Sequence, residues 1–156
     1  MARKGFMACQ GAEFFYEMDG SGDTIVFLHG YPLDSRMWEP QMSVLSSQFQ
    51  VLRCDMRRMG QSAAPEGPST LYEDLHDLLQ QLDVPHASLV GASFGCYAAV
   101  EFALAYPEMV ERLVLLCPGG FAPPSGFSAD GGAAGKSVSA LPAHLPAKLR
   151  PLPERG

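Results

Sequence analysis

Apolar residues in the first 118 positions fall into short strand-like blocks, separated by longer blocks with helical periodicity. The short blocks are rich in β-branched and aromatic residues, a composition that suits strands buried on both faces. They cover residues 13–18, 24–28, 49–55, 86–92 and 111–117. Because strands and helices alternate, the sequence predicts an α/β fold with a mostly parallel sheet and flanking helices.

The connection between the first two predicted strands has the composition of a tight turn. Residues 19–23 read Asp-Gly-Ser-Gly-Asp, and these residue types dominate turns because they tolerate left-handed backbone or bond to it locally. We therefore expect residues 13–18 and 24–28 to form an antiparallel pair.

Three segments between the strands are predicted to be helical. Residues 69–84 place five leucines on one stripe, with Thr70 and Glu73 in capping-box spacing. Residues 94–106 are apolar nearly all round and stop before Pro107, so we expect them to pack tightly on the sheet. Residues 35–47 are a weaker helix candidate, in which Pro40 marks either the first turn or a break.

Composition changes sharply after Pro118, which divides the chain into residues 1–118 and a tail of residues 119–156. The tail contains 7 Gly and 6 Pro in 38 residues, a proportion associated with disorder. We expect residues 1–118 to form one folded unit and the tail to be disordered or loosely attached.

Charge and cysteine content narrow the function classes. The formal net charge is −6 and no run of Lys or Arg is present, so the sequence predicts neither a nucleic acid nor a membrane partner. No apolar stretch reaches the roughly 20 residues that cross a bilayer. The four cysteines form no CxxC pair, which indicates neither a metal site nor a disulfide framework and favours a cytoplasmic location. A small neutral or apolar ligand is the more plausible partner.

Three motifs follow predicted strands and should converge at one rim, because ligands of open parallel sheets bind outside the carboxyl ends of the strands. These motifs are HGYP at residues 29–32, DMRRMGQS at residues 55–62 and GASFG at residues 91–95. The last one fits GxSxG, the nucleophile-elbow pattern, in which a serine lies on a sharp turn between a strand and a helix.

In this order, the three motifs resemble the first half of the α/β-hydrolase fold, in the branch of serine esterases, lactonases, carbon–carbon bond hydrolases and cofactor-free haloperoxidases. The resemblance covers residues 14–117. It implies a truncated α/β-hydrolase fold, a small ester-like substrate, and no metal or organic cofactor.

The resemblance also implies roles for individual residues. Ser93 is the expected nucleophile, and Gly91 and Gly95 keep its turn free of side-chain clashes. The backbone amides of Tyr31 and Phe94 form the expected oxyanion hole.

Two further residues shape the loop before Tyr31, and two residues depart from the family pattern: Arg58, and Cys96, which stands where many members have a second glycine after the elbow. His29 and Gly30 shape that loop, and His29 is not the expected base. The family commonly has D-x-R-G-x-G-x-S, whereas Arg58 stands here at the first glycine. If that position has a positive φ, arginine costs on the order of 1 kcal/mol there.

A serine nucleophile of this kind needs a later acid and a later histidine. Asp130 and His144 follow Ser93 in the required order, but both lie in the Gly- and Pro-rich tail with no strand to fix them. We therefore expect the later triad members to be missing and catalysis to be impaired. Ordinary surface or edge roles explain His76 and His86.

Three interpretations stay open. The first is a serine hydrolase that acts through an acyl-enzyme, and the second is perhydrolase or haloperoxidase-type chemistry at the same serine. The third is a non-catalytic remnant that binds a hydrophobic ligand or a partner chain. Residues 111–117 would leave an apolar strand with an open edge, so we also expect homo-oligomers or aggregation through that edge.

Overall fold

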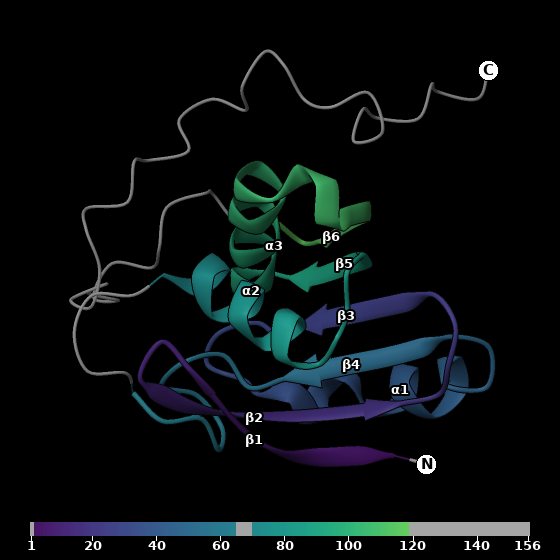
Figure 1. Cartoon of the computed structure of the whole chain (residues 1–156), viewed down its shortest axis with the longest axis horizontal. Coiled ribbons are helices and arrows are strands. Elements are labelled where there is room, and N and C mark those ends of the chain that lie inside the picture. The colour runs from purple at the N-terminus through teal and green to yellow at the C-terminus, as the bar shows by residue number, and fades with distance from the viewer. Residues whose placement is uncertain (1, 65–69, 119–156) are drawn as a thin grey trace.

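The computed structural model describes residues 2–64 and 70–118, and these form a six-stranded, mostly parallel sheet in the order β1-β2-β4-β3-β5-β6 (Figure 1). The predicted α/β fold class is confirmed. Residues 119–156, which the sequence predicts to be disordered, lie outside the described residues. The strands are β1 (Arg3–Cys9), β2 (Ala12–Asp19), β3 (Thr24–Leu28), β4 (Gln50–Cys54), β5 (Ala87–Ala92) and β6 (Val110–Leu116).

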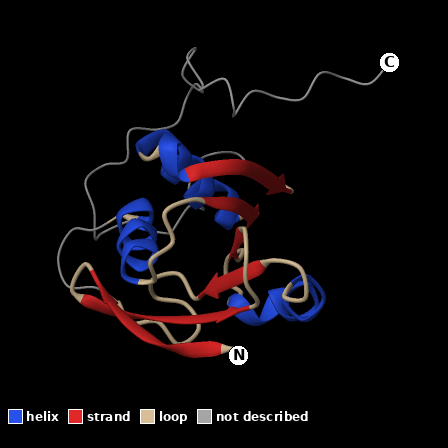
Figure 2. Ribbon diagram, turned by 45° about the vertical axis from the view of Figure 1, so that its right-hand side comes forward, coloured by secondary structure: helices blue, strands red, loops and turns tan. Residues whose placement is uncertain are grey.

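Helices cover both faces of this sheet (Figure 2). Helices α2 (Leu71–Gln81) and α3 (Phe94–Ala105) share one apolar cluster on one face. A short 3-10 turn, η1 (Ser35–Trp38), and α1 (Glu39–Leu45) cover the other face through a second, smaller cluster. Another 3-10 turn, η2 (Pro107–Met109), leads from α3 into β6. Strands buried between two helical layers explain the continuous apolar runs of the sequence.

The predicted leucine stripe faces the larger cluster. Leu75, Leu78 and Leu79 of α2 are buried there, and Thr70 caps the helix by accepting a hydrogen bond from the Glu73 amide at 3.3 Å. Pro40 lies in the first turn of α1, where its missing N–H costs nothing, so the 35–47 segment becomes a 3-10 turn followed by a helix.

Two features of the N-terminal region differ from the sequence prediction. Strand β1 was not predicted, and it pairs antiparallel with β2 through a turn at Gln10 and Gly11, which both have positive φ. The predicted hairpin between β2 and β3 is wrong, because β4 lies between them and pairs antiparallel with β2 and parallel with β3. The Asp-Gly-Ser-Gly-Asp turn reverses the chain, but the space beside β3 is filled by a strand from later in the sequence.

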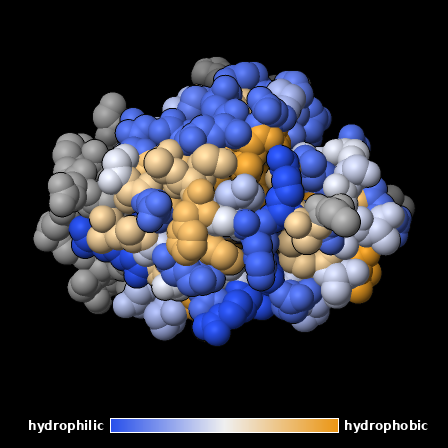
Figure 3. Space-filling model, turned by 60° about the horizontal axis from the view of Figure 1, so that its bottom comes forward, coloured by the Kyte–Doolittle hydropathy of each residue, from blue (hydrophilic) through white to orange (hydrophobic). Residues whose placement is uncertain are grey.

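Strand β6 forms one edge of the described sheet, since within residues 2–64 and 70–118 it pairs with β5 alone. Val114 and Leu116 are 43% and 44% exposed there. At the opposite edge, Phe6 on β1 is 52% exposed and stacks edge-on against Phe15. Seen from the side of β1 and β2, the surface shows apolar patches bordered by hydrophilic residues (Figure 3).

Within the described residues, no helix is long and apolar enough to cross a membrane.

Candidate active site

Ser93 connects β5 to α3 in a conformation that few non-glycine residues adopt. Its φ is +49° and its ψ is −109°, and the residue is exposed. Such backbone costs on the order of 1–3 kcal/mol and persists only where neighbours enforce it. The Ser93 amide donates to the Leu116 carbonyl at 3.0 Å, and the Ser93 carbonyl accepts from the Cys96 amide at 2.9 Å. The turn is therefore held from β6 on one side and from α3 on the other.

Glycines flank Ser93 because no side chain fits beside it. A Cβ on Gly91 would lie 2.4 Å from the Gly95 carbonyl oxygen, and one on Gly95 would lie 2.1 Å from the Leu28 carbonyl oxygen. Both contacts are with backbone, which cannot swing away as a flexible side chain can. The start of α3 thus packs directly on the end of β3, and this close approach fixes where Ser93 points.

The loop after β3 lies against the same turn. A Cβ on Gly30 would come within 3.4 Å of the Ser93 Cβ and 3.3 Å of the Ala92 carbonyl oxygen. The Leu33 amide closes the loop by donating to the Gly30 carbonyl at 2.9 Å. HGYP and GASFG, which are about sixty positions apart in the sequence, therefore meet in space, as their positions after adjacent parallel strands predict.

His29 is fully buried and both of its ring nitrogens face backbone. Nε2 accepts from the Met56 amide at 2.9 Å, so the neutral ring carries its proton on Nδ1, which lies 3.0 Å from the Gly30 carbonyl oxygen and donates to it. Burial lowers the pKa of His29 and so favours this neutral form. The His29 ring thus links the loop after β3 to the loop after β4 by hydrogen bonds, which is a structural role.

The loop after β4 is built around the buried Asp55. Its Oδ1 accepts from the Ser35 amide at 2.8 Å, and its Oδ2 accepts from the Gln61 amide at 2.7 Å. A Cβ on Gly60 would lie 2.1 Å from Asp55 Oδ2, so this position also requires glycine. Arg58 has a φ of +62°, which meets the condition under which the sequence predicts a backbone cost.

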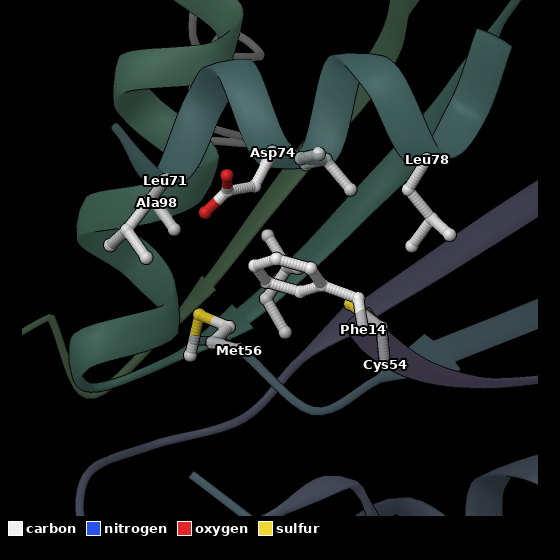
Figure 4. A pocket seen from close by; sticks show the side chains of 9 residues that line it. Phe14, Cys54, Met56, Leu71, Asp74, Leu78 and Ala98 are labelled. Atoms are coloured by element: carbon white, nitrogen blue, oxygen red, sulfur yellow. The ribbon is translucent and has the colours of Figure 1, made fainter. Parts of the chain in front are cut away.

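A small cavity of about 20 Å³ lies beneath α2 (Figure 4), lined by Phe14, Leu28, Cys54, Met56, Leu71, Asp74, Leu75, Leu78 and Ala98. Asp74 Oδ2 accepts from Arg57 Nε at 2.6 Å, whereas Oδ1 is buried without a hydrogen-bond partner among the described residues. Burial raises the pKa of Asp74 to about 7, against the opposing pull of Arg57. At this volume the cavity has room for one water molecule rather than an organic substrate.

The structure brings together Ser93, Gly30, Gly91 and Gly95, whereas the proposed acid and base, Asp130 and His144, lie outside the described residues. His76 stacks on Tyr106 with ring centroids 4.1 Å apart. His86 faces the Glu108 carbonyl at 3.2 Å. Tyr31 is 49% exposed beside the turn, while Phe94 is buried.

No direct signal in the sequence points to the bond between His29 and Met56 or to the two bonds to Asp55. Their positions in HGYP and DMRRMGQS marked them only as members of motifs. No cluster of His, Cys, Asp or Glu that could hold a metal ion occurs in residues 2–64 and 70–118.

Comparison with known proteins supports the likeness inferred from the motifs. The sequence model of a family described as "alpha/beta hydrolase fold" matches residues 23–153, which extends past the described residues. A Synechocystis protein provisionally named a non-heme chloroperoxidase is 35% identical over 68% of this chain and 40% of its own length. Epoxide hydrolase 2 of Siraitia grosvenorii is 37% identical over 62% of this chain and 33% of its own length.

A solved structure agrees with these relatives. A thermophilic esterase from Thermogutta terrifontis superimposes with a TM-score of 0.66 and 30% identity, covering 72% of this chain and 44% of the esterase. The chain thus spans less than half the length of each of these three proteins.

Proposed function

Because this chain belongs to the α/β-hydrolase family, we propose that it carries the nucleophile side of a serine hydrolase for a small ester, lactone or related carbonyl compound. The observation that supports this most is the Ser93 turn. Ser93 is exposed and lies in strained backbone that β6, α3 and three crowded glycines hold in place. Such strain destabilises a fold and is typical of functional sites, so it supports a functional role for the Ser93 hydroxyl.

In the proposed reaction, Ser93 Oγ attacks the carbonyl carbon and the negative charge moves to the carbonyl oxygen. We assign the oxyanion hole to the backbone amides of Tyr31 and Phe94. Two arrangements support this assignment: the loop of Gly30 lies against Ser93, and α3 begins at Phe94 with the positive end of its dipole toward the turn. The carbonyl then re-forms as the ester C–O bond breaks, and the alcohol leaves with the proton that Ser93 lost, so the acyl group stays on Ser93 Oγ. Water attacks this acyl-enzyme, the acid is released, and the proton returns to Ser93 Oγ.

Serine chemistry also favours a carbonyl substrate over an epoxide, although two of the similar sequences and several of the similar structures are named epoxide hydrolases. A serine that opened an epoxide would be left as an ether, which water does not readily cleave. A serine that attacks an ester forms a new ester, which water cleaves through the same oxyanion hole. Ser93 therefore suits acyl transfer. Peroxide in place of water in the second step would give the perhydrolase alternative at the same site.

The proton acceptor is the part of the reaction that the described residues do not supply. His29 is engaged on both ring nitrogens, His76 stacks on Tyr106, and His86 faces Glu108. We propose that the base comes either from His144 or from a segment outside this chain. Without it, the expected activity is low, since a serine hydroxyl is a weak nucleophile until a base takes its proton.

Covalent labelling by a fluorophosphonate probe tests the proposal. We expect labelling that Ser93→Ala abolishes, while the control Ser43→Ala, at an exposed serine on α1, leaves it unchanged. Loss in His144→Ala as well would assign the base to His144. Equal labelling of Ser93→Ala and the parent chain would refute the role of Ser93.

A non-catalytic binding role is the second candidate, and the exposed apolar edge of β6 is the observation that favours it. A further strand or partner chain that paired with β6 would lie beside Val114 and Leu116 and reduce their exposure. Under this alternative, a folded sample would bind a hydrophobic probe equally well before and after Ser93→Ala, and no ester would be turned over.

A further inference from the structure

Two cysteines meet at the point where the Ser93 turn is tied to β6. The Cys96 thiol, in the first turn of α3, donates to the Leu116 carbonyl at 3.3 Å and to the Gly91 carbonyl at 3.1 Å. Cys117 follows Leu116 directly, so the carbonyl that the Cys96 thiol contacts belongs to the peptide bond leading into Cys117. Cys117 is exposed and Cys96 is buried.

Cys117 also acts on the Cys96 thiol electrostatically. Burial is the main cause that raises the pKa of Cys96, and the nearby Cys117 adds to the rise. An exposed thiol beside a buried one is the arrangement in which the exposed sulfur reacts first with an oxidant and the buried one resolves the product.

The other two cysteines have no such access. Cys9 and Cys54 are 1% and 4% exposed, and burial raises the pKa of each to about 12. Cys96 is as buried as Cys9, but it lies next to the exposed Cys117, whereas neither Cys9 nor Cys54 has an exposed thiol beside it that could react first with an oxidant. Cys9 and Cys54 are therefore internal controls for any reaction at Cys96 and Cys117.

We propose that Cys96 and Cys117 are a peroxide-responsive thiol pair that closes to a disulfide and thereby alters the Ser93 turn. A hydroperoxide transfers one oxygen to the Cys117 sulfur, which becomes a sulfenic acid while the peroxide is reduced to water or an alcohol. The Cys96 sulfur then attacks the Cys117 sulfur, the S–S bond forms, and the hydroxyl group leaves with the Cys96 proton as water. Two thiols are oxidised by two electrons, and one peroxide is reduced.

The disulfide would act on Ser93 through bonds that are already present. The Leu116 carbonyl accepts from both the Ser93 amide and the Cys96 thiol, and the Cys96 amide donates to the Ser93 carbonyl. Oxidation removes the thiol proton and pulls the first turn of α3 toward Cys117. Because catalytic geometry tolerates only about 0.5 Å of displacement, this change is expected to slow reaction at Ser93.

Thiol counting and peptide mapping test the modification itself. The folded chain is treated with hydrogen peroxide, alkylated, and analysed by mass spectrometry. We expect the free thiols to fall from four to two per chain, with Cys96 and Cys117 in one linked peptide and full recovery after a reducing agent. Cys117→Ser and Cys96→Ser should both prevent the link, and Cys9→Ala should not.

Several results would overturn the proposal. They are a disulfide that joins Cys117 of two chains, oxidation of Cys117 that stops at the sulfenic or sulfinic acid, or a link that includes Cys9 or Cys54. The effect on Ser93 rests on the proposed function and is measured separately, as the rate of fluorophosphonate labelling before and after oxidation.

We expect oxidation to slow labelling about tenfold in the parent chain and to leave the rate unchanged in Cys117→Ser. Equal rates in oxidised and reduced parent chain would refute the coupling to Ser93. Absence of labelling in the reduced chain would count against the proposed function alone, because peptide mapping still decides whether the disulfide forms.

Discussion

Gly95→Ala is the substitution for which the structure gives the most definite mechanical prediction. The added Cβ would lie 2.1 Å from the Leu28 carbonyl oxygen and 2.8 Å from the His29 carbonyl oxygen. Non-bonded atoms of this kind do not approach within 3.0 Å, so α3 and the end of β3 must separate by about 0.9 Å. The obstacle is backbone on one side and a buried helix on the other, and neither can rotate away.

The net cost follows from two opposing effects. Overpacking of this kind costs about 1–3 kcal/mol, and a clash with strand backbone belongs at the upper end. Alanine recovers at most about 1 kcal/mol through its higher helix propensity. We therefore expect Gly95→Ala to lower the free energy of unfolding by about 2 kcal/mol, and the midpoint of thermal unfolding by about 8 °C.

Urea unfolding followed by circular dichroism measures this loss, and Gly5→Ala is the matched control. An added Cβ on Gly5 meets no atom within 4 Å, and this glycine has no positive φ. The control should change the free energy of unfolding by less than about 1 kcal/mol. Equal stability of the two variants would refute the conclusion that the close approach of α3 to β3 fixes the Ser93 turn.

Three further substitutions test other parts of the site. Arg58→Gly should raise the free energy of unfolding by up to about 1 kcal/mol, since φ is +62° there, and a loss in urea titration would contradict this. Arg57→Met should lower the free energy of unfolding by about 3–5 kcal/mol, because the substitution leaves the buried Asp74 unpaired. The double variant with Asp74→Leu should recover most of that loss in the same urea titration. Burial lowers the pKa of His29 in the folded chain below its value in the unfolded chain. Below about pH 6.5 the unfolded chain therefore binds a proton at His29 that the folded chain does not, so the free energy of unfolding falls as the pH falls. His29→Gln keeps an acceptor for Met56 and should flatten this part of the pH dependence, and an unchanged slope between about pH 5 and pH 8 would refute the assignment.

The strands after residue 20 and the two long helices could be predicted because burial on both faces leaves continuous apolar runs and a clear leucine stripe. Strand β1 could not, since Gln10 and Gly11 are not a strong hairpin signal and Arg3 and Lys4 interrupt the apolar pattern. The pairing of β2 with β4 could not be predicted from the sequence either. It depends on which strand fills the space beside β3, and local turn chemistry carries no information about that.

Motif spacing predicted which loops meet at Ser93, but not how they are held. The bonds that the Ser35 and Gln61 amides donate to Asp55 join residues that share no pattern in the sequence. The bond from Met56 to His29 is of the same kind. Such hydrogen bonds depend on side-chain packing in three dimensions. Which loops come together, in contrast, follows from the order of the strands alone.

The strain at Ser93 separates two requirements of the proposed reaction. The contacts that enforce its positive φ come from β3 and the loop after it, β5, β6 and α3, all of which lie in the described residues, so the proposed position of the nucleophile is set within them. Proton transfer does need one, because the described histidines are engaged elsewhere. In serine hydrolases the oxyanion hole and substrate binding alone retain roughly 10³–10⁴-fold catalysis over water. A chain with the turn but no base should therefore react with an activated phosphonate at a slow, nearly pH-independent rate, whereas a working base would make the rate follow the titration of a histidine.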